Sequence, residues 1–282
     1  MWAVDVHTSR GDGWELAWHR PRSVGARAQY YAGFAEQLDQ PRRTVEWATP
    51  CARVVMVFDA TMTVTTSVPT GAAHVGAFVV GPRAEPVFVD QHGSFRGVEI
   101  GLAAQDTACF LGTTLGDLGE RVVPLGELIG RRADDIHDRL ATAPDWTDAF
   151  DIIDGYFQPS GGSPVDPRLC WAWDMIERNQ GRVRVESIAA EIGWSRRHFA
   201  AKFHHAFGVT PKVAARLFRF ESATRLLRKG LAPARVAVDC GYFDQAHMHR
   251  DFAGFAECTP GAVSAANGTG GGLGSAWPPE GM

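Results

Sequence analysis

The pattern of apolar positions divides the chain into a strand-rich part and a helix-rich part. Between residues 53 and 102, short apolar or alternating runs recur about every ten residues and are separated by Pro and Gly. This pattern is typical of short strands in an antiparallel sandwich or barrel. The runs cover residues 54–58, 61–68, 74–80, 87–89 and 97–102. Residues 1–45 are polar with scattered Trp and Arg, and they predict no particular element.

Helical periodicity replaces the strand pattern after Gln105. Residues 127–140 and 146–157 each place their apolar side chains on one face, which predicts two amphipathic helices. These apolar faces either form a contact between two copies of the chain or pack on the strand-rich part.

Composition shifts mark the domain boundaries. The Pro-, Gly- and Ser-rich segment 159–164 predicts a linker, and the Gly-rich residues 264–282 predict a disordered tail. We therefore expect an α+β protein with two domains. Residues 1–158 form a β-rich barrel or sandwich with trailing helices, residues 159–166 a linker, and residues 167–263 an all-α domain.

Composition also narrows the class of protein. The 282 residues are 45% hydrophobic and 21% charged, which fits a folded globular chain. No apolar run approaches the roughly 18 residues that cross a membrane. The N-terminus reaches polar residues at once, so we expect no signal peptide. The five cysteines are scattered without a C-x-x-C pair, which argues against a disulfide framework or a structural zinc site. We expect a cytoplasmic protein that has no membrane partner.

The charge is distributed unevenly. Residues 1–165 carry 13 basic and 21 acidic residues, whereas residues 166–265 carry 15 basic and 10 acidic residues. A basic segment beside an acidic one makes a polyanion a candidate partner of the basic part. A surplus of this size is also common in proteins that bind no nucleic acid, so charge alone does not decide.

Residues 185–263 contain one pattern twice. The offset between the copies is 48 residues up to a shared glycine and 49 from a shared phenylalanine, so the second copy has one additional residue in its turn. The shared positions are Ile188-Ala189 and Val236-Ala237, Gly193-Trp194 and Gly241-Tyr242, Phe203 and Phe252, and Thr210-Pro211 and Thr259-Pro260.

Each copy fits a helix, a glycine turn and a second helix. In the first copy, Gly193 lies just past residues 186–192, where a left-handed residue ends a helix. Ser195 then caps the next helix, and Phe199 and Phe203 face inward because they are four residues apart. A single copy would equally fit a helical hairpin with a solvated basic face. Two copies in a basic segment favour the geometry that inserts the second helix into the major groove of DNA.

The second copy departs from the first at its cap, where Phe243 takes the place of Ser195 and Asp244 becomes the expected cap. Between the copies, the stretch from Pro211 to Gly230 predicts a helix of about 17 residues, or about 25 Å. Such a helix could hold two recognition helices about one DNA turn apart, roughly 34 Å, on one face of the duplex.

Residues from about 170 to 263 resemble the DNA-binding domain of the AraC/XylS family of bacterial transcription regulators. The resemblance implies a double helix-turn-helix (homeodomain-like) domain of seven helices, with double-stranded DNA at an operator or promoter and RNA polymerase as partners. Residues 98–102 and 122–128 resemble, more loosely, the β-rich regulatory domain of such proteins, which implies sensing of a small-molecule effector or formation of a homodimer. Besides the two copies, the motifs that carry the resemblance are Arg219-x-x-x-Ala223-x-x-Leu226-Leu227 and Asp244-Gln245.

The resemblance also implies which residues contact bases. In the first unit Arg196 and Arg197 are left as the direct readers, because Ala200 and Ala201 stand where the family usually has polar residues and Arg can bond guanine O6 and N7. Other residues are expected to position phosphates or helix starts. The complete set of predicted DNA contacts is Ser195, Arg196, Arg197, His198, Ala200, Ala201, Lys202, Lys212, Arg216, Asp244, Gln245, Ala246, His247, His249 and Arg250.

Other chemistries fit the sequence less well. His247 and His249 are two residues apart and point to different sides of a helix, which disfavours a metal site. DNA repair proteins with a methyl-acceptor domain share this DNA-binding fold but need clustered cysteines, and Cys51 and Cys109 are 58 residues apart. No serine hydrolase, zincin or P-loop motif is present. We expect no enzyme, no catalytic residue, no metal and no cofactor.

Two alternatives stay open. His74 and His92 either line a pocket in the β-rich part or are solvated loop residues. The competing class of protein is a β domain that binds a small molecule, with a helical part that serves as a protein-interaction module. That class predicts that residues 166–265 bind no duplex at moderate salt.

Overall fold

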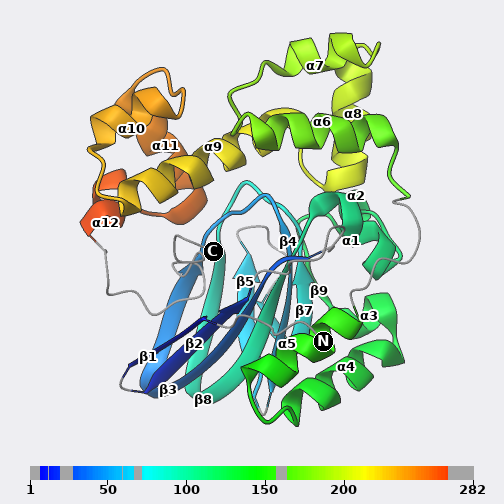
Figure 1. The fold of residues 1–282 in the computed structure, drawn as a ribbon, viewed down its shortest axis with the longest axis vertical. Coiled ribbons are helices and arrows are strands. Elements are labelled where there is room, and N and C mark those ends of the chain that lie inside the picture. Colours follow the sequence, from blue (N-terminus) through cyan, green and yellow to red (C-terminus); the bar gives the residue numbers. More distant parts are fainter. Residues whose placement is uncertain are drawn as a thin grey trace.

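The computed structural model describes residues 7–11, 13–19, 28–58, 60–66, 72–156 and 164–265. The chain forms an N-terminal β-sheet region and a C-terminal helical domain that lies across one end of the sheet (Figure 1). Helices α3 to α5 cover one side of the sheet region (Figure 1). The predicted two-part α+β fold is confirmed.

The described strands belong to one antiparallel sheet of nine strands in the order β1-β2-β3-β8-β4-β7-β9, with β5 pairing both β8 and β6. The long strand β8 pairs with β5 through its first half and with β4 through its second half, so the sheet curls around an apolar interior (Figure 1). The strands are β1 His7–Gly11, β2 Trp14–His19, β3 Ala28–Glu46, β4 Ala52–Phe58, β5 Met62–Thr66, β6 Ala72–Val75, β7 Ala77–Val80, β8 Val87–Leu102 and β9 Val122–Pro124.

Three strands, β1 to β3, lie in the segment for which the sequence predicted no element. Much of the first half of β3 is buried on both faces, with small Ala and Gly side chains between Tyr and Phe, so period-two alternation is absent there. The expected strands 87–89 and 97–102 are parts of the single strand β8. Gly93, one of the glycines between the expected strands, has φ 68° and pairs with Leu38 next to a register shift in which the additional residues belong to β3, so β8 continues through it.

Five short helices follow the long strands. The expected helix over 127–140 is two helices, because Gly130 has φ 59° and turns the chain between them. Strand β9 corrects our expectation that strands stop after Gln105. Ile136, Leu140 and Phe150 are fully buried, so the apolar faces that suggested a contact between two copies are covered within the chain. The helices are α1 Ala104–Leu111, α2 Leu115–Leu118, α3 Leu125–Ile129, α4 Arg131–Ala141 and α5 Trp146–Tyr156.

The helical domain has seven helices within residues 164–265, the number that the family resemblance implied. Its last helix reaches Ala265, two residues beyond the expected domain end, while most of the expected linker and tail lies outside the described residues. No described helix is both long and apolar enough to span a bilayer. The helices are α6 Pro167–Arg178, α7 Val185–Glu191, α8 Arg196–Phe207, α9 Pro211–Arg228, α10 Pro233–Asp239, α11 Gln245–Ala256 and α12 Pro260–Ala265.

Two separate cores support the helical domain. One core is continuous from the sheet region into the first half of the helical domain, and it includes Ile100, Leu115, Trp173 and Phe203. The other core lies in the second half of the domain and takes only Ala48 from the sheet region among its buried members. The two halves of the helical domain are therefore joined to the sheet region to different extents.

Candidate nucleic-acid interface

Helices α7 and α8 form the first helix-turn-helix unit. Gly193, with φ 73°, turns the chain after α7, and the hydroxyl of Ser195 caps α8 by accepting a hydrogen bond from the backbone N–H of His198 at 3.2 Å. Phe199 and Phe203 are fully buried. The cap and the buried face together leave the opposite side of α8 and its first turn exposed.

Helices α10 and α11 repeat this arrangement in the second unit. Gly241 has φ 72°, and Oδ1 of Asp244 accepts a hydrogen bond from the backbone N–H of His247 at 2.6 Å. Phe252 is fully buried, as its counterpart in the first unit is. Both predicted caps are confirmed.

The predicted DNA contacts fall mainly on the exposed starts of α8 and α11, which we call the recognition helices. Helix α9 joins the two units; its 18 residues span about 27 Å at about 1.5 Å per residue. Ala200, Arg216 and His247 are half-buried. The exposed members of the set are Ser195, Arg196, Arg197, His198, Ala201, Lys202, Lys212, Asp244, Gln245, Ala246, His249 and Arg250.

Parts of this chain are similar to known proteins. A 66-residue segment is 32% identical to the HTH-type transcriptional regulator YbfI of Bacillus subtilis, and it spans 23% of this chain and 24% of that relative. Among solved structures, ToxT from Vibrio cholerae aligns with 83% of this chain and 98% of its own at 10% identity and a TM-score of 0.48. The C-terminal domain of AraT from Geobacillus stearothermophilus aligns with 39% of this chain and 98% of its own at 19% identity and a TM-score of 0.35.

Residues 188–266 match the helix-turn-helix domain family. The C-terminal domain is a helix-turn-helix domain of the AraC type. Its two units are those built by α7 and α8 and by α10 and α11, and α9 is the helix between them.

Arg216, one of the residues of the AraC-type domain predicted to contact DNA, forms hydrogen bonds within the chain. Arg216 donates to Oδ1 of Asp251 through Nε at 3.0 Å and Nη2 at 2.7 Å, and its guanidinium lies 4.7 Å from the centre of the Phe255 ring. Asp251 is 1% exposed, and so deeply buried a carboxylate needs a paired cation. Arg216 therefore ties α9 to α11 and positions the second recognition helix. The sequence pattern missed this role because the two partners are 35 residues apart.

Two other predicted contacts line a cleft beside the first unit. His198 and Lys202 face a space of about 360 Å³ that lies between α8, the start of α6 and Thr114 ahead of α2. Arg196 and Arg197 do not line this cleft. The first unit of the AraC-type domain thus presents two cationic surfaces, one at the start of α8 and one along its flank.

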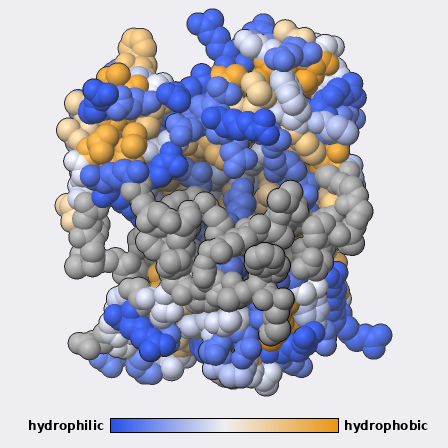
Figure 2. Space-filling view, in the orientation of Figure 1, coloured by the Kyte–Doolittle hydropathy of each residue, from blue (hydrophilic) through white to orange (hydrophobic). Residues whose placement is uncertain are grey.

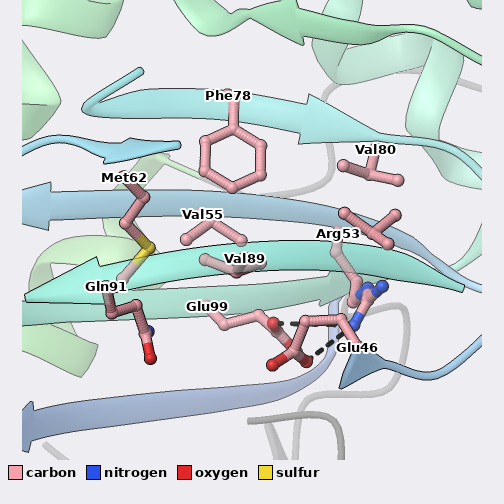
Figure 3. Close-up of a pocket in the computed structure, with 10 residues that line it drawn as sticks. Glu46, Arg53, Val55, Met62, Phe78, Val80, Val89, Gln91 and Glu99 are labelled. Atoms are coloured by element: carbon pink, nitrogen blue, oxygen red, sulfur yellow. Dashed lines mark ion pairs between the residues drawn. The ribbon is translucent and has the colours of Figure 1, made fainter. Parts of the chain in front are cut away.

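A second candidate site lies inside the sheet region. Figure 3 shows an apolar wall that includes Val55 and Phe78 above a charged floor of Glu46, Arg53 and Glu99. Nη1 of Arg53 is 3.5 Å from Oε2 of Glu46 and 4.0 Å from Oε2 of Glu99. Burial raises the pKa of Glu46 to about 7, and its Oε2 accepts no hydrogen bond from the described residues. The floor therefore places two carboxylates beside one guanidinium.

Of the two histidines considered as pocket residues, only His92 can be placed relative to this cavity. His92 is exposed and does not line it, and the side chain of His74 falls outside the described residues. No group of three or more His, Cys, Asp or Glu within the described residues is placed to hold a metal ion.

The sheet region contacts both recognition helices at their C-terminal ends. Gly116 in α2 packs against the backbone carbonyl of His205 in α8, where a Cβ atom would collide with the carbonyl oxygen. The backbone N–H of Ala48 donates to the carbonyl oxygen of Phe255 in α11 at 2.9 Å. These two attachments, which sequence reasoning did not foresee, leave the N-terminal starts of α8 and α11 exposed.

The second attachment begins at the charged floor of the cavity. Glu46 ends β3, and the next two residues are Trp47 and Ala48. Nη2 of Arg53 donates to the carbonyl oxygen of Trp47 at 3.4 Å, and the Trp47 ring lies 6.0 Å from the ring of Phe220 in α9. A continuous set of contacts therefore runs from the cavity to the second unit of the AraC-type domain.

Proposed function

We propose that this protein is a sequence-specific transcription regulator of the AraC/XylS type. Its two helix-turn-helix units would read adjacent major-groove segments of double-stranded DNA. The observation that carries the proposal is the repeated geometry of a glycine turn, a capped recognition helix and an exposed cationic start. This is the arrangement in which the N-terminal residues of a recognition helix meet base edges.

The roles of individual residues follow from their chemistry and exposure. Arg197 is the candidate reader of a guanine in the first unit, since its side chain is exposed at the start of α8 and can donate two hydrogen bonds to O6 and N7. Gln245 and Arg250 are exposed candidates in the second unit. Lys202 and Lys212 are exposed cations that suit phosphates, which position the protein on the duplex.

Selection of duplexes from a random pool tests this proposal. The full-length protein should enrich a motif with two blocks about 10 bp apart at about 150 mM salt, because two recognition helices on one duplex face lie about one turn apart. A pool that stays random, at this salt and at lower salt, would contradict DNA reading and favour the protein-interaction module.

The proposal includes modulation of DNA binding by the N-terminal region, residues 1–158, joined through a linker at 159–166. A small-molecule effector would act at the cavity over Glu46 and Arg53, whose space of about 20 Å³ would have to widen to admit it, and the contacts of this floor extend through Trp47 and Ala48 to the second unit. RNA polymerase is the expected partner at a promoter. No catalytic residue, metal or cofactor is part of the proposal.

Substitution of Gly116 tests whether the contact between α2 and α8 changes DNA binding. Gly116→Ala places a methyl group against the His205 carbonyl and should push α2 away from α8, whereas Gly126→Ala meets no atom within 4 Å. We expect Gly116→Ala to change the affinity for the selected duplex by at least about threefold, or about 0.7 kcal/mol, with Gly126→Ala unchanged. Equal affinities for the two variants would show that the attachment of α8 does not affect DNA binding.

The oligomeric state is open within the proposal. A homodimer would bind two such sites, and the apolar faces of α4 and α5 do not support one because they are covered within the chain. Sedimentation of the full-length protein over a range of concentrations distinguishes a monomer from a dimer by its mass.

A further inference from the structure

The turn of the second unit contains one residue more than the turn of the first. Only Trp194 lies between Gly193 and the cap Ser195, whereas Tyr242 and Phe243 both lie between Gly241 and its cap. Phe243 is therefore the additional residue, and it directly precedes the cap of the recognition helix α11.

Phe243 projects into solvent. Its exposed fraction is 93%, the highest among the exposed large hydrophobic residues in the described part of the chain. Other aromatic side chains of the second unit, including Phe252 and Phe255, are fully buried. On the face drawn in Figure 2, hydrophobic surface gathers over the end of the molecule that holds α10 to α12.

The outward position of Phe243 is set by its two neighbours. The backbone N–H of Tyr242 donates to the carbonyl oxygen of Ala237 at 2.9 Å, and the Tyr242 side chain is 6% exposed with its ring 5.3 Å from the ring of His247. Asp244 on the other side is fixed by its cap hydrogen bond to His247. With both neighbours fixed, Phe243 cannot turn inward without breaking the turn, so its side chain stays on the surface of the second unit.

The position of Phe243 indicates the chemistry of a partner. Phe243 lies directly beside the exposed start of α11. This start presents Gln245 and Ala246 and, one turn later, His249 and Arg250. If this end of α11 enters the major groove, Phe243 enters at its edge. The apolar group that DNA offers there is the C5 methyl of thymine.

We propose that Phe243 is a specificity residue that packs its ring on the C5 methyl group of a thymine at the edge of the DNA segment read by the second unit. The inference rests on the proposed DNA-binding function. It adds an apolar contact to a set of readers that is otherwise polar or alanine.

The test combines a protein change with the removal of one methyl group. Phe243→Ala should weaken binding of the full-length protein to the selected duplex by about three- to tenfold, which corresponds to losing an apolar contact of one methyl or somewhat more. Replacing the contacted thymine by uracil should weaken wild-type binding by a similar factor. The two changes together should cost no more than one of them, because each removes the same contact.

Val238→Ala is the matched control, because Val238 is 74% exposed in the same unit but lies on α10. It should leave the affinity and the preference for thymine over uracil unchanged. Additive losses from Phe243→Ala and uracil at every thymine of the site would overturn the proposal. So would unchanged DNA affinity with reduced transcription, which would assign the ring to a protein partner. If wild-type protein selects no duplex at all, the proposed function itself fails.

Discussion

The two helix-turn-helix units share one backbone plan but are supported differently. The first unit shares a continuous core with the sheet region, and its aromatic side chains Phe203 and Phe207 stack around Trp173. The second unit has a core of its own and is attached mainly through the strand end at Trp47 and Ala48. The sheet region therefore holds the first unit through a larger apolar contact than the second unit.

The units also differ in how their recognition helices are held in place. The position of α8 depends on apolar packing and on the contact of its C-terminal end with α2. The position of α11 depends on apolar packing in the second core and, in addition, on the ion pair of Arg216 with Asp251 and on one backbone hydrogen bond from Ala48. Polar contacts of this kind are few and directional, so each can be removed by one substitution and its effect measured.

The largest expected effect is the loss of the buried ion pair. Arg216→Ala leaves the Asp251 carboxylate buried without a cation and should lower the free energy of unfolding by about 3–5 kcal/mol. Denaturant titration of the full-length protein measures this. Arg235→Ala, which removes an exposed pair with Asp239, should leave stability almost unchanged. Adding Asp251→Asn to Arg216→Ala should recover part of the loss, and similar stabilities for the two arginine variants would contradict the supporting role.

The cavity floor should make stability depend on pH. Burial raises the pKa of Glu46 from an ordinary value near 4.5 to about 7, so the folded protein binds a proton more tightly than the unfolded chain does. The free energy of unfolding should therefore fall by about 2–3 kcal/mol as pH rises from about 4.5 to about 7. Burial also raises the pKa of Glu221 in α9, to about 8, which extends the fall to higher pH.

Glu46→Gln should remove the part of this pH dependence between 4.5 and 7, as followed by denaturant titration at several pH values. The control is Glu191→Gln, which changes an exposed carboxylate at the end of α7. A wild-type stability that rises across this pH range would refute the burial of a protonated Glu46.

In the first unit, substitutions should distinguish a residue that contacts a base from one that contacts a phosphate. Arg197→Ala should cost about 1–3 kcal/mol on the selected duplex and relax the preference at one base pair. Lys202→Ala should weaken binding to all sequences and lower the slope of log affinity against log salt by about one. Titrations at several salt concentrations on the selected and a scrambled duplex measure both. If Arg197→Ala lowers the affinity for both duplexes equally, Arg197 contacts a phosphate and not a base.

The smallest expected effect concerns the ends of the recognition helices. Helix α8 ends at Gly208 with φ 75°, whereas α11 ends at Glu257 with φ 50°. Because side chains with a Cβ atom are strained in this conformation, Glu257→Gly should stabilise the second unit by about 1 kcal/mol and Gly208→Ala should destabilise the first by at least as much. Thermal unfolding of both variants checks the opposite signs, and shifts in the same direction would refute the account.

The helical domain was predictable because its signals are local. Glycine turns, caps and phenylalanines four residues apart lie within one or two helical turns of the residues they organise. The caps at Ser195 and Asp244 and the exposed starts of both recognition helices follow from such signals.

The sheet region was less predictable because its strands are stabilised by partners far away in the chain. Gly93 and Gly130 both have positive φ, yet one lies within a continuous strand and the other ends a helix, and only the neighbouring elements distinguish the two cases. The cavity floor was unpredictable for the same reason. Glu46, Arg53 and Glu99 come from three strands, and no spacing in the sequence brings them together.

The continuous core has a consequence for protein engineering. A chimeric regulator joined between the sheet region and the helical domain would be cut through a continuous apolar core, in which Leu115 of α2 lies together with Trp173 and Phe203 of the helical domain. The border between the two cores runs within α9, where Ala214 and Phe218 belong to the first core and Leu217 and Phe220 to the second. A hybrid regulator with a new second unit would therefore have to match the side chains of α9, such as Phe220 and Arg216, as well as keep the backbone hydrogen bond from Ala48.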